Sequence, residues 1–266
     1  MKACGLVIAL LLAPVAARAA AWTQSAGTWQ FISSTVYSGA DVSFDNHGHL
    51  TAPRLFSRLL EQNDIAYGLT DSMTVFVRGD IAKVQTQALN EPRTDALSTA
   101  VEGGLRWRLP IVPHLLSDYD VMSIEAMGRS AGAYNFSYSA NAMASGRTVG
   151  VRLLYGAPFK AWGHDGFIDL EVGERWLSQP RPTETVMDLT AGLWLGKNWL
   201  VMAQNFNVIS GPARQPYVYY RSHKLQASLA WKVSRRLTLQ VGAFFSPAGQ
   251  NTLDERGLVL SVWKDF

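Results

Sequence analysis

The segment "RGLVLSVWKDF" (residues 256–266) alternates in polarity along its length. Leu258, Leu260 and Val262 occupy every second position, so a β-strand would present all three on one face. An apolar strand face packs either against a protein core or against lipid. The segment alone fits both settings, and the rest of the sequence decides between them.

A second alternating stretch, "YGLTDSMTVFVRGDI" (residues 67–81), ends one strand at a polar corner and starts another at once. The corner comprises residues 69–72, and the strand after it separates two sets of side chains. The first set is Met73, Val75, Val77, Gly79 and Ile81, and the second is Thr74, Phe76, Arg78, Asp80 and Ala82. One face of this strand is therefore apolar, and the other carries charge.

Segments of this kind recur along the chain, each close to the roughly 9–11 residues that a tilted strand needs to cross a bilayer. We expect about twelve strands, near residues 28–37, 54–68, 73–84, 96–109, 121–131, 147–155, 166–177, 184–195, 199–210, 217–232, 236–246 and 256–266. Short connections such as 196–198 alternate with longer ones such as 38–53, which is the pattern of an outer-membrane barrel. The connections 109–120 and 156–166 are long where short turns are expected, either as folded segments or because the strand count differs there.

The faces opposite the apolar ones are rich in small residues. Within residues 96–109, Gly, Ala and Ser share one face with Glu102, Arg106 and Arg108. Small side chains suit a crowded barrel interior better than a free surface. Tryptophans near the predicted strand ends fit an interfacial aromatic girdle. They are Trp107, Trp162, Trp176, Trp199, Trp231 and Trp263.

The N-terminal stretch "MKACGLVIALLLAPVAARAAAW" (residues 1–22) has the features of a secretory signal peptide. A lysine is followed by an apolar run and then by small residues. The small-x-small rule allows cleavage after Ala19 or Ala21. We assign residues 1–21 to the signal peptide and 22–266 to the barrel, and we expect the mature chain to start between Ala20 and Trp22.

The composition excludes several classes of protein. Charged residues make up 17% of the chain, against about 25% in ordinary soluble proteins. Basic residues are spread along the sequence, so we expect no nucleic-acid partner. The only cysteine, Cys4, lies in the signal peptide, which leaves no thiols for disulfides. No run of about 18 apolar residues follows the signal, so no transmembrane helix is encoded.

The aromatic residue at position 266 decides between core and lipid. An alternating strand that ends in an aromatic residue resembles the signal by which the barrel-assembly machinery recognises its substrates. The sequence therefore predicts an all-β fold, a transmembrane antiparallel β-barrel in the cell outer membrane, with both termini periplasmic. Such a barrel must be closed, because an open sheet would leave backbone groups unpaired in lipid. The expected partners are outer-membrane lipid, lipopolysaccharide and the assembly machinery, the last through Phe266.

The predicted register places many charged side chains in the lumen. The basic residues are Arg58, Arg78, Arg106, Arg108, Arg129, Arg152, Arg175, Lys224, Lys232 and Arg236, and the acidic ones are Asp64, Asp80, Glu102, Glu125, Asp169, Glu171, Glu184 and Asp188. Guanidinium groups bind carboxylates bidentately and stack on flat faces. The lumen residues that we expect to contact an acidic or sugar solute are Arg78, Arg106, Arg108, Arg129, Arg152 and Arg175. Because the charges are nearly balanced, an interior held together by arginine–carboxylate pairs is the alternative.

No catalytic constellation stands out. The five histidines are His47, His49, His114, His164 and His223. None lies in a predicted strand beside an obvious nucleophile, as an outer-wall lipid enzyme would require. The motif "FDNHGH" (residues 44–49) has metal-ligand chemistry in Asp45, His47 and His49, but we interpret it as a solvated polar loop. We predict no enzyme activity, no metal and no cofactor.

Several motifs of the N-terminal third form a set. They are Ala21-Trp22-Thr23, Gly27, Gln30, Ser38, Phe44-Asp45, Gly48 and Tyr67-Gly68-Leu69-Thr70-Asp71. With Ala66 in place of Glu, this set resembles the opening of XagA-like outer-membrane proteins. The resemblance implies an outer-membrane protein associated with exopolysaccharide or biofilm production, with a polysaccharide or its secretion machinery as partner. It supplies no catalytic residues.

Two main functions remain open. The first is a channel or export accessory for polysaccharide or for small polar or acidic solutes. The second is a closed structural or adhesion barrel that works through its outer loops, since residues 133–143 and 212–223 have the Tyr, Asn and Ser content of binding loops. A lipid-modifying enzyme on the outer wall is a third possibility.

Overall fold

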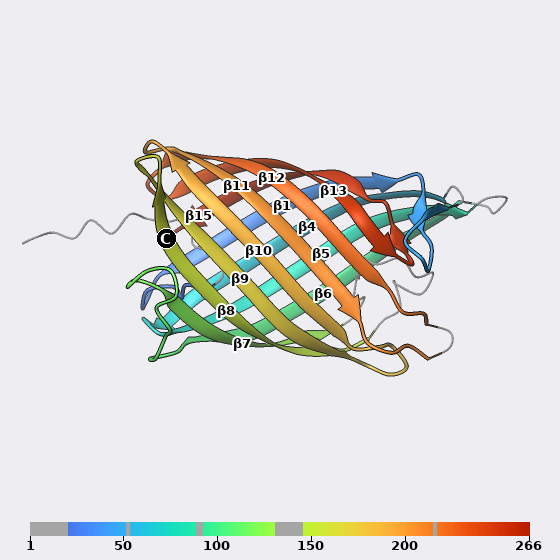
Figure 1. Cartoon of the computed structure of the whole chain (residues 1–266), viewed down its shortest axis with the longest axis horizontal. Helices are drawn as coiled ribbons and strands as arrows, with labels where there is room; N and C mark the ends of the chain where they lie inside the picture. Colours follow the sequence, from blue (N-terminus) through green and yellow to red (C-terminus); the bar gives the residue numbers. More distant parts are fainter. Residues whose placement is uncertain (1–20, 52–53, 89–92, 131–145, 215–216) are drawn as a thin grey trace, which may run out of the picture.

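The computed structural model describes residues 21–51, 54–88, 93–130, 146–214 and 217–266. Twelve strands close into an antiparallel barrel, which confirms the predicted fold (Figure 1). They are β1 (Trp29–Ala40), β4 (Arg54–Thr70), β5 (Met73–Ala88), β6 (Thr94–Arg108), β7 (Val121–Ser130), β8 (Thr148–Ala161), β9 (His164–Leu177), β10 (Glu184–Leu195), β11 (Trp199–Ser210), β12 (Arg221–Ser234), β13 (Leu237–Gln250) and β15 (Arg256–Asp265). Each overlaps one of the predicted segments. Among the described residues, no helix is long and apolar enough to cross a membrane.

The barrel closes where its first and last strands meet. β1 pairs with β15 on one side, with Gln30 opposite Asp265, and with β4 on the other, with Trp29 opposite Tyr67. The tight turns that follow β4, β8, β10 and β12 lie at the same end as Phe266 (Figure 1). We call this the turn end and the opposite end the loop end. β1 starts and β15 finishes at the turn end.

The two connections that are too long for the predicted pattern have different explanations. β8 and β9 extend further than predicted and leave only Trp162 and Gly163 as a turn, both with positive φ, as a tight hairpin requires. The prediction of a long connection at 156–166 is wrong because most of these residues continue β8 and β9. Pairing with β7 stops at Gly156, so Pro158 lies where β8 has a single neighbour and a missing N–H is tolerated.

The other connection, 109–120, is a folded segment at the turn end. Asp120 accepts hydrogen bonds from the backbone N–H groups of Leu115 and Leu116, at 2.9 and 3.0 Å, and from the hydroxyl of Tyr155 on β8. These bonds tie the segment to the barrel wall. The strand count therefore needs no revision here.

Three two-residue strands form a small sheet that was not predicted. They are β2 (Ser43–Phe44), β3 (Leu50–Thr51) and β14 (Thr252–Leu253), paired in the order β14–β2–β3. They belong to the β1–β4 and β13–β15 connections at the loop end. This sheet joins a connection near the N-terminal end of the barrel to one near its C-terminal end.

The alternation sorts side chains as expected. On β5, Phe76 is 4% exposed whereas its neighbour Val77 is 51% exposed. On β15, Leu258, Leu260 and Val262 are all exposed on the outer wall. The apolar faces that define the strands in the sequence therefore face away from the lumen, where a bilayer lies around a barrel of this type.

Most of the predicted tryptophans lie on the outer wall near the strand ends. Trp107, Trp176, Trp199 and Trp231 are exposed there, and Trp162 lies in the β8–β9 turn. The prediction for Trp263 is wrong. This residue packs inside the barrel against a cluster of Phe167, Leu200, Met202 and Ala230. Its position on β15 shares the inward face of Val259 and Ser261, both buried, so the alternation rather than the nearby chain end decides its direction.

The apolar outer wall also carries carboxylates, and Glu61 is one of them. Glu61 of β4 shares the outward face with Leu59 and Ile65, which are both exposed. Its oxygens accept hydrogen bonds from Ser33 and Thr35 of β1, at 2.8 and 2.6 Å. No cationic group pairs with it among the described residues.

Candidate functional site: the barrel lumen

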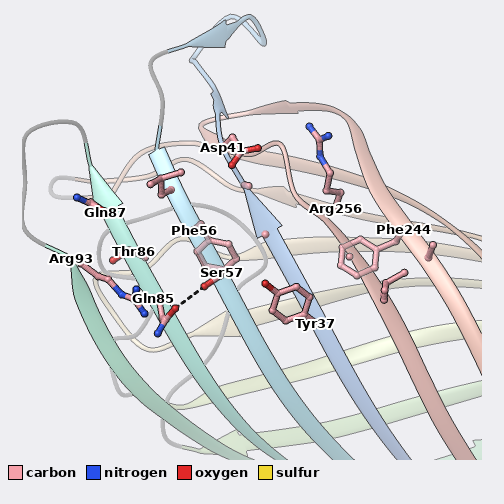
Figure 2. A pocket seen from close by; sticks show the side chains of 16 residues that line it. Tyr37, Asp41, Phe56, Ser57, Gln85, Thr86, Gln87, Arg93, Phe244 and Arg256 are labelled. Carbon is pink, nitrogen blue, oxygen red and sulfur yellow. Dashed lines mark hydrogen bonds between the residues drawn. The ribbon is translucent and has the colours of Figure 1, made fainter.

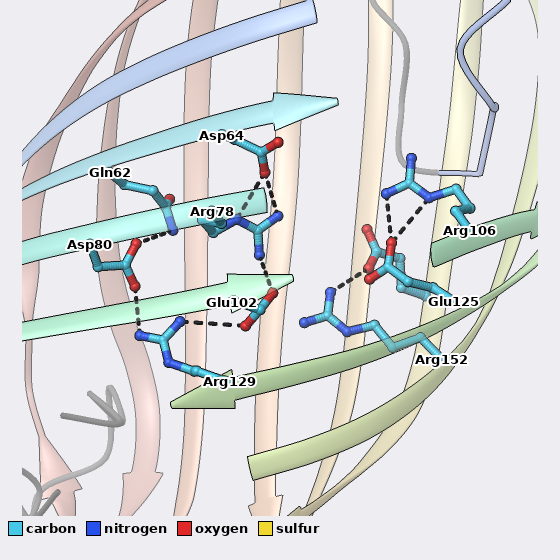
Figure 3. A network of polar contacts seen from close by, with 10 residues as sticks. Gln62, Asp64, Arg78, Asp80, Glu102, Arg106, Glu125, Arg129 and Arg152 are labelled. Carbon is cyan, nitrogen blue, oxygen red and sulfur yellow. Dashed lines mark hydrogen bonds and ion pairs between the residues drawn. The ribbon is translucent and has the colours of Figure 1, made fainter. Parts of the chain in front are cut away.

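The inner wall of β4 to β7 carries a connected network of ion pairs (Figure 3). Arg78 binds Asp64 at 2.7 Å and Glu102 at 2.9 Å. Arg129 binds Asp80 at 2.6 Å and also reaches Glu102 at 3.4 Å. Glu102 therefore lies between two guanidinium groups from β5 and β7. Because Arg129 and Asp80 belong to strands that are not neighbours in the wall, this contact bridges across β6.

Further pairs continue around the wall. Arg106 donates from two nitrogens to one oxygen of Glu125, at 2.7 and 3.1 Å. Arg152 binds Glu171 at 3.0 Å. Arg175 lies 3.6 Å from Glu184, which also accepts a hydrogen bond from the hydroxyl of Tyr220.

The structure thus places the six sequence-predicted arginines in two groups. Five of them, Arg78, Arg106, Arg129, Arg152 and Arg175, form ion pairs on the inner wall. Arg108 ends β6 at the turn end, where its backbone N–H donates to the carbonyl of Ser72. Its side chain is partly exposed, and no ion pair forms there within the described chain. Contact of these residues with a solute remains a prediction.

At the loop end, the connection between β14 and β15 bonds to inward side chains of β1, β4 and β12, and we call this contact the loop-end closure of that part of the wall. Glu255 is fully buried and accepts hydrogen bonds from Arg58 of β4 at 2.8 Å and from Ser38 of β1 at 2.6 Å. Its second oxygen binds the ammonium of Lys224 of β12. Burial raises the pKa of Glu255, but Arg58 and Lys224 outweigh it, so the pKa is lower than usual. Leu253 completes this closure by packing against Phe56 and its neighbours in an apolar cluster.

Sequence reasoning missed this closure. Arg58 and Lys224 were placed in the lumen, but their shared partner lies in a connection without periodicity. The sequence separation between Arg58 and Glu255 is 197 residues. No local pattern reports a contact of that kind.

The turn end is crossed by residues 21–26, which we call the N-terminal segment. Its backbone bonds to inward side chains of three strands. The N–H of Ala21 donates to Asp169 of β9 at 2.7 Å, and its carbonyl accepts from Ser123 of β7 at 2.6 Å. The N–H of Gln24 donates to Thr74 of β5 at 2.8 Å. The segment therefore runs from the β5 side of the mouth to the β9 side.

Trp22 anchors the N-terminal segment inside the barrel. Its ring meets Phe167 edge to face with 6.3 Å between the centroids, and it packs against the apolar cluster that holds Trp263. The carbonyl of Trp22 accepts from Arg106 at 3.4 Å. A Cβ atom at Gly156 of β8 would lie 2.4 Å from the Trp22 ring, so glycine at this position makes room for the segment. One sequence signal points to this segment, the motif Ala21-Trp22-Thr23, but this motif coincides with the predicted cleavage region.

A pocket of about 730 Å³ lies at the loop end, in the wall formed by β5, β4, β1, β15 and β13 (Figure 2). Its outward lining combines Tyr37 and Leu55 with the pair formed by Ser57 and Gln85, whose side chains bond at 3.1 Å. Two arginines reach it, and each already has an acidic partner. Arg93 pairs with Asp95 at 3.3 Å and Arg256 with Asp254 at 3.4 Å. The positive charges of this pocket are therefore compensated locally, and its lining also includes Asp41.

The histidines form no recognisable catalytic or metal site in the described ranges. Asp45 accepts from the backbone N–H groups of His47 and His49, at 2.8 and 2.9 Å, and these bonds lower its pKa. On the outer wall, His223 of β12 bonds Asn207 of β11 at 2.5 Å. No hydroxyl nucleophile bonds to His223, and no group of three or more potential metal ligands occurs among the described residues.

The sequence matches no protein-family model, and no curated protein matches it. Solved structures share the fold. The COG4313 outer membrane channel from Pseudomonas putida F1 has a TM-score of 0.71 and 13% identity, covering 93% of this chain and 98% of that one. The translocator domain of autotransporter NalP from Neisseria meningitidis has a TM-score of 0.53 and 12% identity, covering 91% and 90%. The β domain of the Bordetella autotransporter Brka has a TM-score of 0.52 and 12% identity, covering 91% and 100%.

At these identities the likeness concerns the fold alone. The chain is a closed twelve-stranded antiparallel barrel of the outer-membrane type.

Proposed function

We propose that this chain is a narrow outer-membrane channel for small polar or acidic solutes, closed at rest by its own N-terminal segment. The observation that carries the proposal is the way in which this segment is held. It is joined to the wall by hydrogen bonds to side chains such as Thr74 and Ser123 and by one aromatic contact, not by strand pairing. It can therefore leave the mouth while every ladder of the barrel stays intact.

The charged inner wall suits a solute with anionic groups. Glu102 occupies a position between the guanidinium groups of Arg78 and Arg129, at 2.9 and 3.4 Å. A solute carboxylate could exchange with it, since both arginines are already oriented for charge-assisted hydrogen bonds. A passage lined by charges also concentrates counter-ions along its axis.

Acidic oligosaccharides are the solutes that we favour. They offer carboxylates to the arginines, and their ring faces can stack on guanidinium planes. We retain an association with exopolysaccharide or biofilm production, and with the corresponding secretion machinery, on the strength of the N-terminal resemblance. The location that follows from the proposal is the outer membrane, with lipopolysaccharide around the loop end.

A closed structural barrel is the second candidate. The observation that favours it is the pairing of five arginines with carboxylates on the inner wall. Such a barrel would act through its outer loops. Of the two loops that the sequence suggests for binding, 133–143 lies outside the described residues, and 212–223 is described apart from 215–216.

Single-channel conductance of the refolded protein in a planar bilayer separates the two candidates. Heat-modifiable migration first establishes that the protein is folded. We expect discrete openings that acidic oligosaccharides block more strongly than neutral ones. Arg129→Gln should weaken the block, whereas Lys160→Gln, whose side chain is 81% exposed in the β8–β9 hairpin, should not. Folded protein without any conductance would support the closed barrel instead.

A further inference from the structure

The outer wall changes from apolar to polar near the loop end of β15, β1, β4 and β5. The strand registers define two neighbouring rows of outward side chains on these four strands. The row nearer the turn end is Leu258, Tyr37, Leu59 and Lys83, and the next row toward the loop end is Arg256, Gly39, Ser57 and Gln85. We call these two rows the outer-wall groove. The groove is amphipathic, because its first row is largely apolar and its second is polar.

Gly39 makes a hollow in the outer-wall groove. It lies directly opposite Ser57 of β4 and two residues from Tyr37, and all three line the pocket of about 730 Å³ (Figure 2). Tyr37 is 60% exposed, and its hydroxyl points toward the bonded pair of Ser57 and Gln85. An exposed aromatic ring can pack against the face of a sugar, and amides and hydroxyls beside it can bind sugar hydroxyls. The hollow therefore offers a sugar ring both an aromatic face and polar partners.

Lys83 adds a positive charge to the groove. It is exposed on β5 between Leu59 of β4 and Leu97 of β6, and it lies two residues from Gln85 on the same face. Within the described ranges, Lys83 forms no ion pair. A lysine among apolar side chains on a lipid-facing wall extends its ammonium group toward the lipid head groups. This charge is therefore free to bind an anionic group of a lipid.

The groove lies at the level where the hydrocarbon part of the membrane ends. Trp29 starts β1 at the turn end, is exposed on the wall and contacts Tyr67. From Trp29 to Gly39, β1 rises by about 33 Å, since each residue of a strand adds roughly 3.3 Å. At a strand tilt near 40° this rise is about 25 Å along the barrel axis, which is the height of the apolar band of such barrels. A lipid head group in the leaflet at the loop end would therefore meet the groove.

We propose that the outer-wall groove binds one molecule of lipopolysaccharide through its lipid A part, a phosphorylated and acylated glucosamine disaccharide. A sugar ring packs against Tyr37 and bonds the pair of Ser57 and Gln85, and a phosphate binds the ammonium group of Lys83. The acyl chains follow the exposed face of Leu59 and its neighbours toward the turn end. The inference rests on the proposed location in the outer membrane with the loop end outward, and it does not depend on conduction.

The other charges near the groove are compatible with a phosphate. Arg93 and Arg256 each pair with an aspartate, but both arginines are more than half exposed, and exposed pairs contribute little to stability. Either guanidinium group can therefore turn toward a phosphate. Asp41 is exposed to solvent beyond Gly39. Glu61, one row nearer the turn end than Lys83, already accepts two hydrogen bonds from β1.

The first test is binding of purified lipids to the refolded protein in detergent, measured by native mass spectrometry. The probes are lipid A with two phosphates, dephosphorylated lipid A and phosphatidylglycerol. We expect one molecule of phosphorylated lipid A to bind, and the dephosphorylated form to bind about tenfold more weakly, as for the loss of one charge-assisted contact. Equal binding of phosphatidylglycerol would show that the groove accepts any anionic lipid and would overturn the assignment to lipid A.

The second test uses matched pairs of outer-wall variants. Lys83→Gln should weaken binding of phosphorylated lipid A by about tenfold. Arg147→Gln should not, because Arg147 is an exposed cation next to β8, on the opposite side of the closed ring. Tyr37→Ala should weaken binding of both forms of lipid A, whereas Trp176→Ala, at an exposed aromatic residue near the loop end of β9, should leave it unchanged. Equal effects in the groove and control variants would show that lipid A has no defined site here.

Conductance of the same preparations separates this inference from the proposed channel. Heat-modifiable migration first shows that each variant is folded. A folded, conducting protein that binds no lipid A would refute the groove site and leave the channel intact. Lipid A bound at the groove of a protein that never conducts would support the site and refute the channel alone.

Discussion

Two glutamates show how location decides the role of one residue type. Glu255 is buried between Arg58 and Lys224 and joins strands on two parts of the wall. Glu61 faces outward and bonds the hydroxyl groups of Ser33 and Thr35. The first carboxylate has two cations to offset its burial, whereas the second pairs with no cation in the part of the chain that the structure describes. Their substitutions should therefore have opposite effects on stability.

Replacing Glu255 with Gln should destabilise the barrel by about 3–5 kcal/mol, since it removes the carboxylate with which two buried cations pair. The pKa of Glu255 is lowered in the folded state, so its contribution is present above about pH 4.3, the value for an unperturbed Glu, and is lost as the pH falls through the lower folded value. Urea unfolding at pH 7 should separate the variant from the wild type, and unfolding in strong acid should not. Asp165→Asn, which alters an exposed pair with Lys160, is the control.

Replacing Glu61 with Leu should stabilise the barrel in lipid vesicles by about 1 kcal/mol, because a carboxylate on the lipid-facing wall is unfavourable. The measurement is urea unfolding followed by tryptophan fluorescence. Leu59→Ala, a neighbour on the same face, provides a reference for lost apolar contact with lipid. A clear loss of stability in Glu61→Leu would mean that another protein, not lipid, covers this wall.

For single residues, the sequence predicts which face of a strand a side chain occupies better than it predicts which residues that side chain contacts. Period-two alternation correctly predicts Arg78, Arg129 and Arg152 on the inner wall, because successive side chains of a strand point to opposite faces and the apolar set marks the outer one. It could not place Glu255 or Ala21, whose positions depend on the closed barrel bringing distant segments together. The direction of Trp263 was misjudged because proximity to the chain end was given more weight than its register.

The strands differ from the other elements in how well they can be predicted. A membrane-spanning strand is long enough to show its alternation, and all twelve were found. The two-residue strands β2, β3 and β14 carry no periodicity, and the N-terminal segment has no regular structure at all. The contacts of the N-terminal segment at the turn end and of Glu255 at the loop end both come from these irregular elements. The parts that bear most directly on function were therefore the least predictable.

The fit of the N-terminal segment against β8 can be tested at one glycine. Gly156→Val should displace Trp22, since even a Cβ atom would lie 2.4 Å from its ring, and we expect more frequent channel openings. The crowding should also cost about 1–3 kcal/mol in stability. Gly128→Val on β7 is the matched control, because a Cβ atom there meets nothing within 4 Å. Unchanged openings in folded Gly156→Val would show that the segment does not limit conduction.

At the scale of the molecule, the lumen is a charged interior that the N-terminal segment crosses at the turn end and that the β14–β15 connection covers in part at the loop end. The loop-end closure joins Glu255 to two strands through buried ion pairs, whereas the turn-end closure depends on hydrogen bonds to the main chain of residues 21–26 and on the packing of Trp22. We expect the two ends to open with different ease. High salt screens exposed charges far more than buried ones, so it should leave the loop-end closure in place.

Truncation tests whether ring closure is needed for the fold. A chain that stops at residue 255 lacks β15 and leaves β1 and β13 with one unpaired edge each. We expect it to show no heat-modifiable migration and to aggregate on refolding, because exposed strand edges pair with other chains. The control is Phe266→Ala, which keeps the strand and should refold in detergent. A folded, monomeric truncation would show that the remaining strands can close without β15.

The pairing of β1 with β15 also determines which step of barrel assembly comes last. Because the chain is made from its N-terminus, β1 is available early and β15 only at the very end. Every intermediate before that point therefore has open strand edges. Every precursor, however many hairpins it has formed, offers two open strand edges to its surroundings. Joining ends more than 200 residues apart adds only a modest entropic cost, since that cost grows with the logarithm of loop length. Aggregation therefore competes with assembly until β1 pairs with β15 and the barrel closes. Any factor that covers the edge of β1 during this interval increases the fraction of the protein that folds.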